Sequence, residues 1–213
     1  MPDFSASIYS KLPKVGNTIF STMSALAKKE NAINLSQGFP DFNCSPELIE
    51  LVCEAMRAGH NQYAPMAGLI ELREKIAEKT SFLYSGNYDP ESEITITAGA
   101  TQAIFTAIAA TVNEGDEVII FTPAYDCYEP AIELVGGKPV YVQLSENEYR
   151  VNWEEVKKVI NQRTKMIIIN TPHNPTGSIL SGQDLQKLDK LISNSDILVL
   201  SDEVYEHILF DGY

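Results

Sequence analysis

Three residues with chemically useful side chains, Asn174, Asp202 and Tyr205, lie in two short polar segments. Asn174 belongs to N-T-P-H-N-P-T-G, and the other two belong to S-D-E-V-Y. Each segment follows four apolar residues, 166–169 and 197–200, a pattern typical of a strand that is buried on both faces. In an open α/β sheet the ligand lies beyond the carboxyl ends of parallel strands, so we expect the three side chains to meet at one site.

An amide, a carboxylate and a phenol suit a pyridine ring that carries a phenolic oxygen. The Asp202 carboxylate can keep the ring nitrogen protonated, while Asn174 and Tyr205 can donate hydrogen bonds to the phenolic oxygen. These are the requirements of pyridoxal phosphate (PLP), which needs an acidic partner at its ring nitrogen. Two simpler interpretations stay open, because N-P-T-G is a common turn composition and Asp202 could cap a following helix.

The two segments together resemble those of a known family. N-P-T-G followed at a distance by D-E-V-Y is similar to the class I and II aminotransferases of PLP fold type I. The resemblance extends over essentially the whole chain and implies PLP as the cofactor. It also implies that Asp202, Asn174 and Tyr205 form the catalytic group, with Asn174 facing the substrate as well.

A second candidate site is the turn A-G-A-T-Q, which precedes a nearly continuous apolar stretch at 103–112. We expect a strand at 94–97 and a buried helix at 103–112, so that free N–H groups at the helix start can bind a phosphate. The spacing is not G-x-G-x-x-G, which argues against a dinucleotide. The turn resembles the phosphate-binding turn of the family, and the resemblance assigns this role to four residues: Gly99, Ala100, Thr101 and Gln102.

Two tyrosines acquire roles from the resemblance. The family keeps an aromatic residue two positions after a proline that follows a strand, stacked on the pyridine ring, and Tyr125 matches it, with Tyr128 as its packing neighbour or its alternative. Tyr63 matches a tyrosine that the family donates to the cofactor phosphate of the neighbouring subunit, which implies a homodimer. The simpler interpretation of Tyr63 is an ordinary packed tyrosine.

The segment N-L-S-Q-G-F-P-D-F is similar to the methionine and kynurenine aminotransferase subgroup. This resemblance implies that the Gly38 N–H helps to bind the α-carboxylate of the substrate and that Phe39 lines the pocket for its side chain. The alternative is a buried linker turn.

Composition limits the classes of function. With 213 residues and a net charge of −13, the chain is a poor candidate for binding nucleic acid or an anionic membrane. Its three cysteines lack C-x-x-C spacing and its three histidines lack metal-ligand spacing, so we expect free thiols and no metal site. No signal-like or membrane-spanning apolar run is evident, and we expect a cytoplasmic protein.

Alternating strand and helix patterns predict the fold class. We expect strands at 118–121 and 139–142 beside those at 166–169 and 197–200. We expect further helices at 18–29, 46–58, 69–83, 153–160 and for about a dozen residues after Ser181. The expected N-caps are Ser45 for the helix at 46–58, Asn152 for the helix at 153–160 and Ser181 for the last helix, and Glu155 is expected to complete a capping box with Asn152. This order predicts an α/β fold with three α/β/α layers and a mostly parallel sheet. The resemblance implies the aspartate aminotransferase-like large domain at 44–213, incomplete at the C-terminus, with 1–43 as an N-terminal arm and the start of a small domain.

The lysine that transamination requires is not found at a matching position. The family supplies it in a serine-rich turn well after D-E-V-Y, and the last lysine of this chain is Lys190. We therefore expect the 213 residues alone to be inactive. The resulting hypothesis is an aminotransferase that moves an amino group from an L-amino acid, methionine or an aromatic or kynurenine-like acid, to a 2-oxo acid.

The same sequence features bear on several rival functions. A cysteine-S-conjugate β-lyase on the same scaffold, or a non-catalytic fragment, stays open. A PLP-sensing transcription regulator is disfavoured because the first 34 residues are too short and not basic enough for a winged helix. A plain nucleotide-binding domain is disfavoured by the absence of a dinucleotide fingerprint.

Overall fold

The computed structural model describes residues 9–13, 15–38, 40, 42–210 and 212. The chain divides into two compact units, which are described separately below. The first unit consists of residues 17–97, and the second unit consists of residues 98–213 together with those before residue 17.

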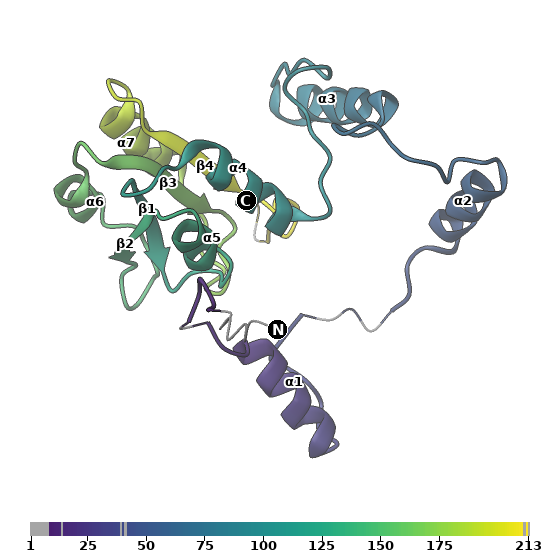
Figure 1. The fold of residues 1–213 in the computed structure, drawn as a ribbon, viewed down its shortest axis with the longest axis horizontal. Helices are drawn as coiled ribbons and strands as arrows, with labels where there is room; N and C mark the ends of the chain where they lie inside the picture. The colour runs from purple at the N-terminus through teal and green to yellow at the C-terminus, as the bar shows by residue number, and fades with distance from the viewer. Residues whose placement is uncertain (1–8, 14, 39, 41, 211, 213) are drawn as a thin grey trace, which may run out of the picture. The chain divides into compact units, whose positions relative to one another are not determined.

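A four-stranded parallel sheet forms the centre of the second unit (Figure 1). Its strands are β1 (Glu117–Thr122), β2 (Lys138–Gln143), β3 (Thr164–Asn170) and β4 (Leu198–Asp202), in the order β2-β1-β3-β4. All three pairs of neighbouring strands are parallel. The register places Asn170 directly opposite Asp202, so β3 and β4 end side by side.

Helices cover both faces of the sheet, which confirms the three-layer prediction. α4 (Ala100–Thr111) and α5 (Tyr128–Leu134) pack on one face, and α6 (Trp153–Val159) and α7 (Gly182–Ile192) pack on the other. Alternate residues of β1 and β3 point into the two cores. The first core contains Ile104, Ile108, Val118, Ile120, Ile132, Met166 and Ile168. The second contains Ile119, Phe121, Trp153, Val156, Ile167, Ile169 and Leu188. Each such side chain stabilises the fold by about 1.5–3 kcal/mol relative to exposure, and burial on both faces explains the unbroken apolar runs of β1 and β3. The prediction that 197–200 is buried on both faces is wrong: β4 is the edge strand, and its Leu198 and Val199 are each 39% exposed.

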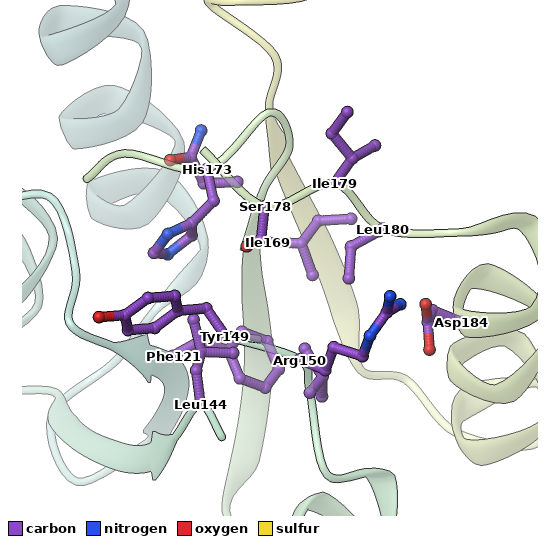
Figure 2. Close-up of a pocket in the computed structure, with 12 residues that line it drawn as sticks. Phe121, Leu144, Tyr149, Arg150, Ile169, His173, Ser178, Ile179, Leu180 and Asp184 are labelled. Carbon is purple, nitrogen blue, oxygen red and sulfur yellow. The ribbon is translucent and has the colours of Figure 1, made fainter. Parts of the chain in front are cut away.

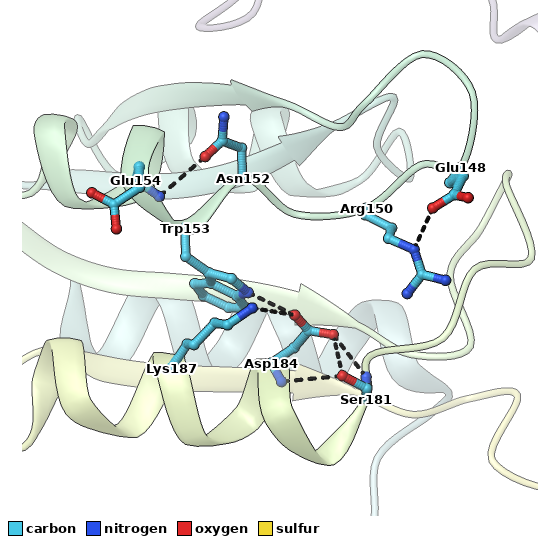
Figure 3. A network of polar contacts seen from close by, with 8 residues as sticks. All are labelled: Glu148, Arg150, Asn152, Trp153, Glu154, Ser181, Asp184 and Lys187. Atoms are coloured by element: carbon cyan, nitrogen blue, oxygen red, sulfur yellow. Dashed lines mark hydrogen bonds and ion pairs between the residues drawn. The ribbon is translucent and has the colours of Figure 1, made fainter.

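Side-chain caps begin the two helices of the second core, α6 and α7 (Figure 3). The Asn152 side chain accepts from the N–H groups of Glu154 and Glu155. Ser181 caps α7 as predicted and forms a reciprocal capping box with Asp184. The Trp153 indole N–H donates to Asp184 Oδ1 at 2.9 Å, so one carboxylate both starts α7 and joins it to α6.

The capping box expected at Asn152 is only half formed. The carboxylate of Glu155 accepts from Lys158 Nζ at 2.6 Å. The i,i+3 ion pair on the exposed helix surface thus uses the side chain that the box would have required.

The strand predicted at 94–97 is wrong. These residues, part of the first unit, have no regular secondary structure, and the Ile96 N–H donates to Ala67 O at 2.9 Å instead of entering a ladder. Apolar and β-branched residues favour extended backbone, but a strand also needs a neighbouring strand with which to pair. The following helix, α4, begins at Ala100, three residues earlier than predicted.

The first unit contains three helices: α1 (Ile19–Lys29), α2 (Pro46–Arg57) and α3 (Ile70–Tyr84). The Thr18 side chain caps α1, whereas the predicted cap of α2, Ser45, makes no side-chain hydrogen bond to its helix. Arg73 of α3 is buried and donates to Pro90 O at 2.6 Å, which fixes the turn after this helix. Among the described residues, none of the helices is long and apolar enough to cross a membrane.

Candidate active site

The carboxyl ends of β3 and β4 bring Asn174, Asp202 and Tyr205 together, as the sequence predicted. All three line one cavity of about 240 Å³. Its remaining lining residues are Ala100, Thr101, Tyr125, Asn170 and Val204. Six of the predicted site residues, from four separate stretches of the chain, therefore share one cavity: Ala100, Thr101, Tyr125, Asn174, Asp202 and Tyr205.

Asp202 is the acidic residue of this cavity, and it is only 8% exposed. Its Oδ2 accepts from the Tyr128 hydroxyl at 2.6 Å, and its Oδ1 accepts from the Val204 N–H at 3.2 Å. These two donors fix the orientation of the Asp202 carboxylate. Burial and the hydrogen bond to Asp202 raise the pKa of Tyr128, so its hydroxyl stays a donor at neutral pH.

Tyr128 is a site residue whose contact with Asp202 the sequence analysis did not predict. It does pack against Tyr125, edge to face, with ring centroids 5.9 Å apart and an interplanar angle of 76°. Its hydroxyl nevertheless contacts Asp202, while Tyr125 lines the cavity. The available signal was the position of Tyr128 at the start of an amphipathic helix that packs on the sheet.

Asn170 is a second site residue that the sequence analysis did not single out. It is the last residue of β3 and is 7% exposed. Its side chain donates to Asp202 O at 2.8 Å and accepts from the Asn174 N–H at 2.7 Å. A polar residue closing an apolar strand was the signal that could have identified it.

The start of α4 forms one wall of the cavity. Gly99 occupies the N-cap position with φ of 87° and ψ of 167°, and no side chain caps the helix. The first N–H groups of a helix have no acceptor within it, so this end can bind an anion. Gln102 turns back, and its Oε1 accepts from the Ala98 N–H at 2.6 Å. The phosphate-binding role of these residues stays a prediction.

The other predicted site residues lie outside this unit. Tyr63 and Gly38 belong to the unit of residues 17–97, in which both are exposed. Phe39 lies outside the described residues. The roles assigned to these three residues stay predictions.

His173 lines a different, smaller cavity (Figure 2). Its ring Nδ1 lies 2.8 Å from Thr176 Oγ1, and burial lowers the pKa of the ring. The space beside it, lined also by Ile169, Ser178 and Leu180, measures about 20 Å³, room for about one water molecule. His173 therefore helps to shape the loop and is not a member of the larger cavity.

Comparison with known proteins agrees with this arrangement. The model of the family "Aminotransferase class I and II" matches residues 30–213. The chain belongs to this family. Methionine aminotransferase of Escherichia coli is 50% identical over 201 residues, which are 94% of this chain and 52% of that protein. Kynurenine–oxoglutarate transaminase 1 of Mus musculus is 34% identical over 216 residues, which are 95% of this chain and 51% of that protein.

Solved structures of aminotransferases have the same fold. A crystal structure from Escherichia coli, reported with a methionine aminotransferase function, superposes with a TM-score of 0.92 at 49% identity, covering 95% of this chain and 53% of that one. N-succinyldiaminopimelate aminotransferase of Mycobacterium tuberculosis superposes with a TM-score of 0.92 at 37% identity, covering 97% of this chain and 54% of that one. The chain thus spans about half the length of these relatives.

Aminotransferases of this family depend on PLP, and the cavity fits that cofactor. It combines a buried carboxylate, two tyrosine side chains, two asparagine side chains and a helix start without a side-chain cap. The carboxylate suits the ring nitrogen, the tyrosine and asparagine side chains suit the ring with its phenolic oxygen, and the helix start suits the phosphate. Among the described residues, no lysine lines this cavity and no cluster of acidic, histidine or cysteine side chains could hold a metal ion.

Proposed function

We propose that this chain forms the cofactor-binding part of a PLP-dependent aminotransferase. The observation that carries the proposal is the position of Asp202, which is buried at the end of β4 and shares a cavity with Asn174, Tyr205 and the start of α4. A buried carboxylate needs a favourable partner, and Tyr128 and the Val204 N–H supply only part of it. A protonated pyridine nitrogen completes that partnership.

Each side chain would have a specific task toward the cofactor. Asp202 holds the proton on the ring nitrogen, and Asn174 and Tyr205 donate to the phenolic oxygen. Tyr125 stacks on the ring, which contributes about 0.5–1.5 kcal/mol beyond the burial of area. When bound, PLP supplies an electron sink for the bond broken at the amino acid Cα.

The phosphate would bind at the start of α4, through Gly99, Ala100, Thr101 and Gln102. Their N–H groups lie at the positive end of the helix dipole, where an anion is stabilised. Tyr63 of a second copy of the chain would complete the phosphate site, which makes the active form a homodimer.

The proposed amino donor is methionine, with an aromatic or kynurenine-like acid as the second choice, and the acceptor is a 2-oxo acid. The 50% identity to a methionine aminotransferase supports this order, compared with 34% for a kynurenine transaminase. Gly38 and Phe39 are proposed to contact the substrate, together with Asn174. We propose a cytoplasmic location, which the three free cysteines support.

The test is the variant Asp202→Asn in the complete protein that contains this chain. We expect the wild type to bind PLP and to release the 2-oxo acid of methionine. We expect the variant to fold normally and to lose at least about 100-fold in kcat/KM, because it loses a preorganised charge at the ring. Asp196→Asn, the same change at an exposed carboxylate, serves as the control.

Near-normal activity of Asp202→Asn would contradict the assignment. The products also separate the alternative function on this scaffold. Pyruvate and ammonia from a cysteine S-conjugate, without a 2-oxo acid from methionine, would identify a β-lyase instead.

A further inference from the structure

Asn170 connects the two segments that carry the candidate catalytic group. It closes β3 and lies opposite Asp202 in the register of the parallel sheet. Its Nδ2 donates to the main-chain oxygen of Asp202 at 2.8 Å, and its Oδ1 accepts from the main-chain N–H of Asn174 at 2.7 Å. A single buried side chain thus holds the backbones of both residues.

The chemistry of these two contacts requires an amide. One end must donate to a carbonyl and the other must accept from an N–H, and a carboxamide of this length does both. Aspartate has the same shape but, when ionised, has no hydrogen to donate. Alanine can make neither contact.

The loop has few other ties at this point. The prolines at 172 and 175 carry no N–H, while the N–H of His173 donates to Ser178 O and that of Gly177 donates to His173 O. Those bonds close the loop on itself. At the start of the loop the Thr171 N–H donates to Asp202 O at 3.1 Å, and four residues from the end of β3 the Asn174 N–H donates to Asn170 Oδ1, which ties the candidate phenolic-oxygen donor itself to the end of the sheet.

We propose that Asn170 is a positioning residue that holds Asn174 and Asp202 at a fixed separation. It would keep Asn174, the proposed donor to the phenolic oxygen, and Asp202, the proposed partner of the ring nitrogen, at the spacing that one ring requires. This inference rests on the proposed function for the identity of the ring. Asn170 acts through the backbones of its two neighbours.

The first experiment measures amide hydrogen exchange in the cofactor-free protein, resolved by mass spectrometry to single residues between 171 and 177. In Asn170→Ala we expect the Asn174 amide to exchange at least about tenfold faster, because it loses its buried acceptor. The amides of Thr171, His173 and Gly177, which have main-chain acceptors, should be unchanged. In Asn170→Asp the Asn174 amide should stay protected, since the acceptor is kept.

The second experiment measures steady-state kinetics in the complete protein. Both variants should lower kcat by about tenfold to 100-fold while KM for the amino acid stays within about threefold, because the fault lies in the alignment of the cofactor and not in substrate binding. The control is Asn147→Ala, the same truncation at an exposed asparagine, which should leave kcat and all four amides unchanged. Circular dichroism verifies folding, and if one variant does not fold, the other decides the result.

The outcomes separate this inference from the proposed function. If the wild type neither binds PLP nor releases a 2-oxo acid, the proposed function fails, and the exchange experiment still tests whether Asn170 holds the loop. If the wild type is active but Asn170→Ala leaves the Asn174 amide protected, or Asn170→Asp keeps the wild-type kcat, the positioning role is refuted.

Discussion

Removing the Tyr128 hydroxyl tests the most buried polar contact of the candidate site. Tyr128→Phe keeps the ring and its packing, so the change isolates the hydrogen bond from Tyr128 to Asp202, which measures 2.6 Å. Both residues are buried, with exposures of 3% and 8%. A hydrogen bond to a charged group contributes about 1.5–3 kcal/mol, so we expect the variant to lose about 2 kcal/mol of unfolding free energy.

Urea unfolding at pH 7 measures this loss. With a slope of about 2 kcal/mol per molar urea, the midpoint should fall by about 1 M. Tyr125→Phe is the matched control. It removes a hydroxyl from the neighbouring ring and leaves the hydrogen bond between Tyr128 and Asp202 in place. A difference below about 0.5 kcal/mol between the two variants would refute the reasoning, because that is the size of an ordinary surface change.

The pH dependence gives an independent check. The pKa of Tyr128 is raised in the folded protein, by burial first and by the bond to Asp202 second. A group with a raised folded pKa contributes stability that is fully present below its unfolded pKa, about 10 for tyrosine, and that is lost as pH rises above it. The stability difference between wild type and Tyr128→Phe should therefore be constant from pH 7 to about pH 9.5 and should shrink above about pH 10.

Three further predictions concern other contacts. The pKa of buried Glu117 is lowered, first by the hydrogen bond from Asn161 and then by Arg163, so its contribution is present above the ordinary glutamate pKa and lost as pH falls. Glu117→Gln should flatten the acid side of a stability profile measured by urea unfolding from pH 7 to pH 3, and an unchanged profile would contradict this assignment. Trp153→Phe removes the indole donor to Asp184 and should lower the unfolding free energy by about 2 kcal/mol. A loss no larger than that caused by substituting an exposed residue would show that the hydrogen bond between α6 and α7 contributes little to stability. Gly99→Ala should lower the unfolding free energy by about 1–2 kcal/mol, because φ is 87° at this residue. Gly182→Ala is the control, since Gly182 also has open space at its Cβ but has no positive φ. An equal loss of unfolding free energy in the two variants would rule out backbone strain as the cause.

Much of the sheet and of the candidate site could be predicted from short-range patterns. The apolar run at 166–169 became β3, which is covered on both faces, and the run at 197–200 became β4, the edge strand, on which Leu198 and Val199 are exposed. The polar segments after them had to leave the strands at the same edge, since parallel strands end on the same side. That geometry brought Asn174, Asp202 and Tyr205 into one cavity.

Contacts between distant residues could not be read in the same way. The segment 94–97 has the composition of a strand but no strand partner, and its Ile96 N–H pairs with Ala67 instead. The roles of Tyr125 and Tyr128 were also undecided, because residues three apart differ in function only once α5 has packed on the sheet.

The sequence by itself determined which polar residues follow which apolar strands, and where a glycine allows the backbone to start α4. These features depend on neighbouring residues, so their patterns are visible along the chain. Only the tertiary structure decided that Tyr128 binds the carboxylate of Asp202 and that Asn170 joins Asn174 to Asp202. Those contacts depend on strand register and helix docking, which bring together residues up to 74 positions apart and leave no local signature.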